Sequence, residues 1–198
     1  MAHPSDPVAA QHTVLILLGS GRHPSHSSAL AEAIGEAFEQ IGQWRVTAYG
    51  EAQAPVADPR YHADPRRHPD PGVRELVALA DAADALVWVS PVYHNSYSSH
   101  IKTLLDHLAN AQVERKVVGL ASHGGHRGSQ AVDALRIVAR GFNAIASPTN
   151  VCTRGDDYAD LPGGGYRLTS DEIHGRIRRF AAEIDAMTHA LAAFRRRD

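Results

Sequence analysis

Five short apolar segments recur along the chain, and each is followed by a stretch with helical spacing. The predicted strands are residues 14–18, 44–49, 85–90 and 116–121, with a fifth split at Pro148 into 144–147 and 150–153. Residues 14–18 and 85–90 are continuous apolar runs, which is typical of strands covered on both faces. Alternation of strands and helices predicts an α/β protein with a parallel sheet.

Apolar residues at i, i+4 spacing mark the first helix through Leu30, Ile34 and Phe38. The predicted helices are residues 27–40, 73–83, 99–111 and 130–140, and a last one to about residue 194. The pattern Thr169-x-x-Glu172 predicts a capping box at the start of that last helix. Two polar segments, 55–72 and 154–168, are predicted as long surface loops.

Five strands joined by helices favour a flavodoxin-like, doubly wound sheet with the strand order 2-1-3-4-5. In that order, the carboxyl ends of the first, third and fourth strands lie together, and each of these strands is followed by a polar loop. We therefore expect a ligand site at this edge of the sheet. The whole chain, 1–198, is expected to form one domain with residues 1–11 as a flexible tail.

Bulk composition is ordinary for a globular protein, with 43% hydrophobic and 21% charged residues. A net charge of -2 provides no general basic field for nucleic acid or membrane. No apolar run approaches the roughly 20 residues of a membrane span, and the polar, proline-broken start predicts no signal peptide. Cys152 is the only cysteine, which excludes thiolate zinc sites and suits a reducing cytoplasm. Despite 13 histidines, we expect no metal site, because no His-Glu-x-x-His pattern occurs.

The first polar loop, residues 19–28, combines glycines, four serines and one fixed charge, Arg22. It precedes a helix, whose N-terminal N–H groups favour an anion. The loop lacks the lysine of a P-loop and the glycine spacing of a dinucleotide fingerprint, so its hydroxyls suit a monophosphate better than a pyrophosphate. An ordinary turn with a serine N-cap is the alternative.

The second and third polar loops follow the strands at 85–90 and 116–121. Pro91 and Tyr93 suit the wall of a slot for a flat heteroaromatic ring, while Gly124 and Gly125 allow backbone N–H groups to approach the ring edge. The alternative is that these are decorated surface loops whose tyrosines pack inward.

Three motifs at these strand ends together resemble the NAD(P)H-dependent FMN reductase family of flavodoxin-like proteins. They are Gly-Ser-x-Arg-x-x-Ser with a later Leu-Ala, Pro-x-Tyr-x-x-Ser with a later Lys and Asp, and a Ser-Gly-Gly-like turn with a later Leu-Arg. The matching residues are Gly19, Ser20, Arg22, Ser25, Leu30, Ala31, Pro91, Tyr93, Ser96, Lys102, Asp106, Ser122, Gly124, Gly125, Leu135 and Arg136. The resemblance spans about residues 13–152.

The resemblance implies an FMN site made by all three loops, in a homodimer that takes hydride from NAD(P)H and passes it to a small-molecule acceptor. It assigns the FMN phosphate to Ser20, Arg22, Ser25 and Ser27. It assigns the flavin ring and ribityl chain to Pro91, Val92, Tyr93, His94, Asn95 and Ser96, and the pyrimidine edge to Ser122, His123, Gly124 and Gly125. The chain departs from the family pattern at Ser98, Ser99, His100 and His123.

Two other functions fit parts of this pattern. A flavodoxin-type electron carrier would bind FMN without turning over nicotinamide, although such carriers resemble acidic proteins with a threonine-rich phosphate loop. A phosphate-binding protein without flavin could use the same fold. The sequence chooses neither between NADH and NADPH nor among free flavin, quinone, azo compound, nitro compound and oxygen as acceptor. It identifies no certain catalytic residue, and His94, Asn95 and His123 are candidates to tune the ring or contact the second substrate.

Overall fold

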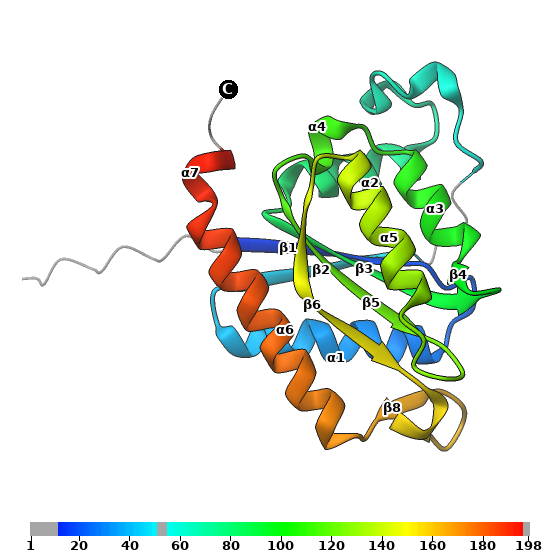
Figure 1. The fold of residues 1–198 in the computed structure, drawn as a ribbon. Coiled ribbons are helices and arrows are strands. Elements are labelled where there is room, and N and C mark those ends of the chain that lie inside the picture. The colour runs from blue at the N-terminus through cyan, green and yellow to red at the C-terminus, as the bar shows by residue number, and fades with distance from the viewer. Residues whose placement is uncertain (1–11, 51–54, 196–198) are drawn as a thin grey trace, which may run out of the picture.

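A computed structural model of the chain describes residues 12–50 and 55–195. Its main sheet contains the parallel strands β1 His12–Leu18, β2 Trp44–Tyr49, β3 Ala85–Tyr93, β5 Val117–His123 and β6 Ile145–Thr153. Their spatial order is β2-β1-β3-β5-β6, which confirms the predicted flavodoxin-like arrangement (Figure 1). The expected tail, residues 1–11, lies outside the described residues.

Helices cover both faces of this sheet (Figure 1). The α-helices are α1 His26–Ile41, α2 Pro71–Ala82, α3 Ser99–Asp106, α4 Asn110–Val113, α5 Gln130–Gly141, α6 Asp171–Ala190 and α7 Ala192–Arg195. Side chains of β1 alternate between the two layers: Ile16 joins the apolar cluster with α1 and α6, and Leu17 joins the cluster with α2 and α3. The continuous apolar run of β1 therefore contributes side chains to both apolar clusters, one on each face of the sheet.

Gly119, in the middle of β5, permits one of these layers to pack closely. A Cβ atom built there would lie 2.4 Å from Phe180 Cζ and 2.5 Å from Ile184 Cδ1, both on α6. Because such contacts are too short for real carbon atoms, a side chain at position 119 would push α6 away from the sheet.

Three predicted helix ends differ from the structure. Helix α1 begins at His26, behind the N-cap Ser25, and α2 begins at Pro71, behind the N-cap Asp70. The predicted capping box at Thr169 is wrong, because Ser170 caps α6 while the backbone N–H of Thr169 donates to Asp157 O at 2.9 Å.

The predicted helix over 99–111 is two helices, α3 and α4. Helix α3 ends at Asp106, and α4 begins at Asn110. The Gln112 side chain accepts a hydrogen bond from the backbone N–H of Ala109 at 3.1 Å and so caps the start of α4. The predicted helix to about residue 194 likewise ends at Ala190, and the short α7 follows it.

Strand predictions need two corrections. The strand at 85–90 continues to Tyr93 and folds back onto β4 Ser96–Tyr97. The fifth strand is not broken in two: β6 continues through Pro148, and its register against β5 shifts there instead. An edge strand tolerates proline because the missing N–H costs no ladder bond on its open side.

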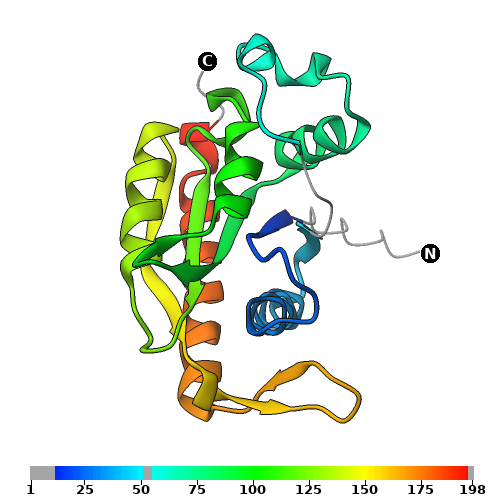
Figure 2. The same cartoon turned by 90° about the vertical axis from the view of Figure 1, so that its right-hand side faces the viewer.

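Both predicted loops contain regular structure. Residues 55–72 include two 3-10 turns, η1 Pro59–Tyr61 and η2 Pro65–Arg67, and the start of α2. Residues 154–168 include a 3-10 turn, η3 Gly155–Asp157, and a hairpin of β7 Tyr158–Asp160 and β8 Tyr166–Leu168. Figure 2 shows this hairpin, in orange, lying beside α1, in blue. Among the described residues, no helix combines the length and apolar character needed to cross a lipid bilayer.

Candidate FMN site

A pocket of about 190 Å³ lies at the carboxyl edge of the sheet and contains residues from all three polar loops. It is lined by Ser20, Arg22, Ser25, His26, Ser27, Pro91, Val92, Tyr93, His123, Gly124 and Gly125. Four residues predicted for the site, His94, Asn95, Ser96 and Ser122, do not line this pocket. His26 also lines the pocket, although the sequence pattern did not predict it. The pattern placed the helix start at residue 27, whereas α1 begins at His26, directly after the N-cap Ser25.

Two of the three hydroxyls predicted to bind the phosphate, those of Ser20 and Ser25, have structural partners in the first loop. Ser25 Oγ accepts from the backbone N–H of Ser28 at 3.0 Å, and the Ser28 hydroxyl accepts from the backbone N–H of Ser25 at 2.9 Å, which completes a capping box. Ser20 Oγ donates to the carbonyl of Arg22 at 2.9 Å. These two serines shape the loop and the helix start.

The other hydrogen-bond donors of the first loop that face an anion site have no partner within the described part of the chain. They are the hydroxyl of Ser27, the guanidinium of Arg22 and the first backbone N–H groups of α1, at His26 and Ser27. A helix N-terminus presents such N–H groups together with about half a positive charge. This set of donors is therefore suited to an anion.

The second loop is a tight turn between β3 and β4. His94 and Asn95 both have left-handed backbone conformations, with φ of 48° and 60°, as a type I′ hairpin requires. Ser96 pairs with Tyr93 across this hairpin, and the Tyr93 side chain remains 54% exposed. The turn therefore holds Tyr93 at the pocket while His94 and Asn95 lie outside its lining.

A hydrogen bond couples the second loop to the first. Ser98 is the N-cap of α3, and its hydroxyl also donates to the carbonyl of Gly19. A Cβ atom at Gly19 would lie 2.6 Å from Ile101 Cβ, so only glycine permits this approach of the two loops. The departure at Ser98 from the family pattern thus serves the packing of the site.

The third loop brings His123 against His26 from the first loop. Their rings stack at 4.4 Å between centroids with planes 10° apart, and His26 also stacks on Tyr166 of β8 at 3.7 Å. Tyr158 of β7 meets both histidines edge-on. A histidine–tyrosine cluster, made of His26, His123, Tyr158 and Tyr166, therefore ties the hairpin to the pocket.

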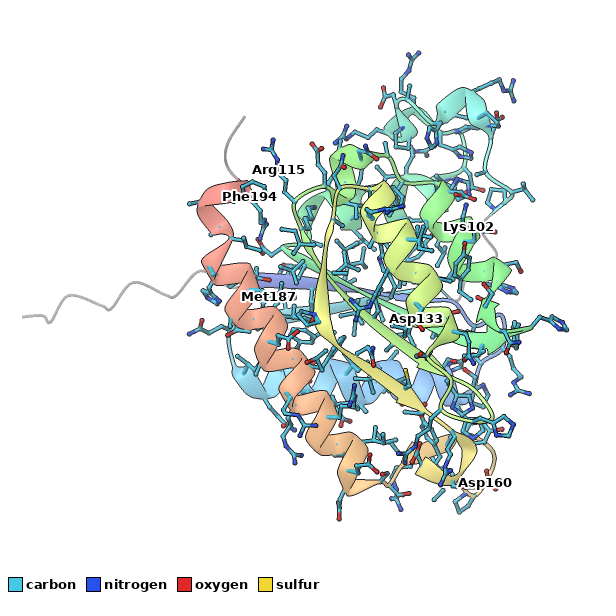
Figure 3. All side chains as sticks on the ribbon, viewed as in Figure 1. Lys102, Arg115, Asp133, Asp160, Met187 and Phe194 are labelled. Atoms are coloured by element: carbon cyan, nitrogen blue, oxygen red, sulfur yellow. The ribbon has the colours of Figure 1, made fainter. Side chains whose placement is uncertain are left out.

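Burial favours the uncharged form of both histidines in this cluster. It lowers the pKa of His123 to about 4, with a smaller contribution from nearby His26. Burial also lowers the pKa of His26, and the positive charge of Arg22 adds to this effect against the opposing charge of Asp160. Figure 3 labels Asp160 on the hairpin.

Ser122 supports the third loop from within the protein. It is fully buried, and its hydroxyl donates to the carbonyl of Gly128 at 3.3 Å. Farther along the same loop, Arg127 is paired with both Asp157 and Glu172. Gly124 and Gly125, between Ser122 and Arg127, line the pocket, and a Cβ atom at Gly124 would lie 2.8 Å from Val92 Cβ. These contacts hold the backbone of the third loop beside the second.

Comparison with known proteins relates most of the chain to a family of enzymes. The family model described as NADPH-dependent FMN reductase matches residues 12–157. An FMN-dependent NADPH-azoreductase from Staphylococcus saprophyticus is 32% identical over 173 residues, which cover 86% of this chain and 92% of that protein. The enzyme of the same description from Staphylococcus aureus strain USA300 matches with the same identity and coverage.

Solved structures with low sequence identity share the fold. An oxidoreductase from Corynebacterium diphtheriae is 22% identical, has a TM-score of 0.67, and the match covers 92% of this chain and 99% of that one. An NAD(P)H:acceptor oxidoreductase from Paracoccus denitrificans is 20% identical, also with a TM-score of 0.67, over 92% of this chain and 98% of that one.

These findings confirm the predicted fold, the dependence on FMN and the oxidoreductase activity with NAD(P)H. They leave the role of each pocket residue as a prediction. The chain belongs to the family of NADPH-dependent FMN reductases.

Proposed function

We propose that the pocket at the carboxyl edge of the sheet binds FMN and that the first loop holds its phosphate. The observation that carries this proposal is the group of donors without partners at one helix start: the Arg22 guanidinium, the Ser27 hydroxyl and the N–H groups of His26 and Ser27. Ser20 and Ser25 line the same pocket and support the loop through their own hydrogen bonds.

The other two loops form the ring side of the proposed site. Pro91, Val92 and Tyr93 supply an apolar and aromatic wall, and Gly124 and Gly125 supply backbone without side chains. We assign His94, Asn95 and Ser96 to the turn that orients Tyr93, and Ser122 to the support of the third loop. In this assignment, those four residues act on FMN through the residues that they hold.

FMN, when bound, supplies the redox chemistry by accepting a hydride from the nicotinamide and passing it to the acceptor. We propose NADPH as the donor and an azo compound as an acceptor. The support for both is the similarity to azoreductases that are 32% identical over 86% of this chain. The protein contributes the hydrogen-bond donors for the phosphate, the walls of the ring site and the positive charge of Arg22.

Flavin analysis tests the cofactor and the reaction together. The purified protein should release FMN on denaturation, its bound flavin should bleach with NADPH in the absence of oxygen, and an azo dye should then restore the yellow colour. Stoichiometric FAD would contradict the monophosphate site. Bound FMN that NADPH does not bleach would favour an electron carrier, and failure to take up any flavin would favour a phosphate-binding protein of another class.

We further propose that the chain acts as one domain, in a homodimer, in the cytoplasm. Both apolar clusters share the same sheet, which supports one domain. Exposure of Tyr93 beside the pocket supports a partner subunit that completes the wall, since twofold dimers are the commonest oligomers. Light scattering at micromolar concentration tests the dimer: the mass of one chain with full activity would contradict it.

A further inference from the structure

Thr153 and Tyr158 are close to His123, but neither residue lines the pocket. Pro91, His123 and Thr153 are neighbours in register on β3, β5 and β6, at the carboxyl edge of the sheet. Thr153 is fully buried. Its hydroxyl must therefore find its hydrogen-bond partners inside the protein.

The hydroxyl of Thr153 links Tyr158 to His123. Tyr158 Oη donates to Thr153 Oγ1 at 2.9 Å, which leaves Thr153 with one proton to donate. The two candidate acceptors for this proton are His123 Nδ1 at 3.1 Å and the carbonyl of Ser122 at 3.4 Å. The shorter distance favours His123 Nδ1 as the acceptor. An uncharged imidazole that accepts at Nδ1 carries its proton on Nε2.

The Nε2 atom of His123 remains available at the pocket. No group in the described residues forms a hydrogen bond with it, although His123 lines the pocket. The buried side-chain polar atoms without partners in the same part of the chain are Trp88 Nε1 and Thr188 Oγ1, so His123 Nε2 is accessible rather than sealed. Stacking on His26 also limits rotation of the ring.

We propose that Thr153 and Tyr158 are positioning residues that fix His123 as its Nε2–H tautomer, so that Nε2–H donates a hydrogen bond to bound FMN. This inference rests on the proposed FMN site. The tautomer itself is a property of the chain without flavin, because its three hydrogen-bonding groups all belong to the protein. The two parts can therefore be tested separately.

Nitrogen-15 NMR of the histidine rings tests the tautomer in flavin-free and FMN-loaded protein. Wild-type His123 should be the Nε2–H tautomer in both. Thr153→Val, which removes the donor to Nδ1, should give a mixture of tautomers, and Thr153→Ser should restore the wild-type signal. Tyr158→Phe removes the donor to Thr153 Oγ1 and should change the tautomer populations of His123 less than Thr153→Val does. A wild-type His123 with its proton on Nδ1 would overturn the proposal.

Flavin titration tests the consequence for FMN. Thr153→Val should weaken FMN binding by about three- to tenfold, the usual effect of one hydrogen bond. In a His123→Ala background the same change should have no further effect, because the residue that it positions is absent. Thr149→Val removes a hydroxyl of β6 that bonds Glu183 instead of His123 and is the matched control, with unchanged FMN affinity.

The outcomes separate the two proposals. FMN binding that is equal in wild type and Thr153→Val, or an equal loss with and without His123, would overturn the positioning role while leaving the FMN site intact. If wild type binds no FMN, the proposed function fails, and NMR of the flavin-free protein still decides the tautomer. Should Thr153→Val not fold, Tyr158→Phe and Thr153→Ser provide the same comparison.

Discussion

The two ends of the main sheet both carry charged and polar side chains, but they differ in how these are partnered. At the carboxyl end, within the described residues, no partner contacts the guanidinium of Arg22, the hydroxyl of Ser27 or Nε2 of His123. All three belong to residues that line one small pocket. Donors gathered at one pocket in this way are suited to a ligand that accepts hydrogen bonds.

At the amino end, comparable groups are bonded to one another. Asp84 accepts from the backbone N–H of Thr13 at 3.0 Å and from Arg195 at 2.8 Å. Lys116 Nζ donates to the carbonyl of Ala80 at 2.6 Å, and burial lowers the pKa of Lys116 to about 8. The Arg195 contact fastens α7 to the residue before β3, and the Lys116 contact joins the residue before β5 to α2.

Size does not distinguish a binding site from a structural cleft here. The amino-end pocket measures about 410 Å³, against about 190 Å³ at the carboxyl end. Figure 3 labels Arg115 and Phe194 at the amino end, where the guanidinium lies 5.5 Å from the ring centroid. The proposed FMN site is the smaller pocket, and what distinguishes it is the group of donors without partners at a helix N-terminus.

Removal of the charge at the carboxyl end should have the largest effect. Arg22→Ala should weaken FMN by about tenfold or more, because a charge-assisted hydrogen bond contributes about 1.5–3 kcal/mol. Riboflavin, which lacks the phosphate, should bind nearly as well to the variant as to wild type. Arg195→Ala, at the amino end, is the matched control and should leave FMN affinity unchanged. Equal losses for FMN and riboflavin would show that Arg22 acts on the fold.

Removal of the acceptor at the amino end should change stability instead of binding. Asp84→Ala leaves the Thr13 N–H and the Arg195 guanidinium without their acceptor. The free energy of unfolding should fall by about 1–3 kcal/mol, measured by urea titration. FMN affinity of the folded variant should equal that of wild type. Weaker FMN binding by this variant would contradict the assignment of binding to the carboxyl end and of structural contacts to the amino end.

Two serines of the first loop, Ser25 and Ser27, differ in the same way: one hydroxyl has a structural partner and the other has none among the described residues. Ser25→Ala removes the cap of α1 and should lower the free energy of unfolding by about 1 kcal/mol. Ser27→Ala removes a hydroxyl that holds no structural bond, so it should weaken FMN by about three- to tenfold with little change in stability. The reverse pattern in urea and flavin titrations would contradict the roles given to these two hydroxyls.

The remaining prediction is a dependence of stability on pH that arises from His123. Its pKa is about 4 in the folded protein against an ordinary value of 6.5, so the unfolded chain binds more protons between these limits. This contribution is complete above pH 6.5 and is lost as the pH falls from 6.5 to 4. Urea titrations of wild type and His123→Asn should diverge in this window. Parallel curves would show that His123 has the same pKa in the folded and the unfolded protein.

Much of the site was predictable because its motifs lie in short segments next to strongly patterned strands. The glycines and serines of residues 19–28 and the Pro-x-Tyr segment at 91–93 were recognised from local sequence. Four predicted residues, including His94 and Ser122, nevertheless do not line the pocket, because a hairpin turn and a buried hydroxyl direct them elsewhere. Sequence spacing identifies a loop, but the backbone conformation decides which of its side chains reach a ligand.

The sequence by itself determined the order of the strands, the two apolar layers and the edge of the sheet that carries the site. These depend on periodicity and on βα topology, both of which are local or nearly local properties. Tertiary structure alone decided that His26 stacks on His123, that the hairpin brings Tyr166 to them and that Thr153 contacts His123. Those contacts join residues 30 or more positions apart, and they form only when separate elements pack, so no sequence pattern encodes them directly.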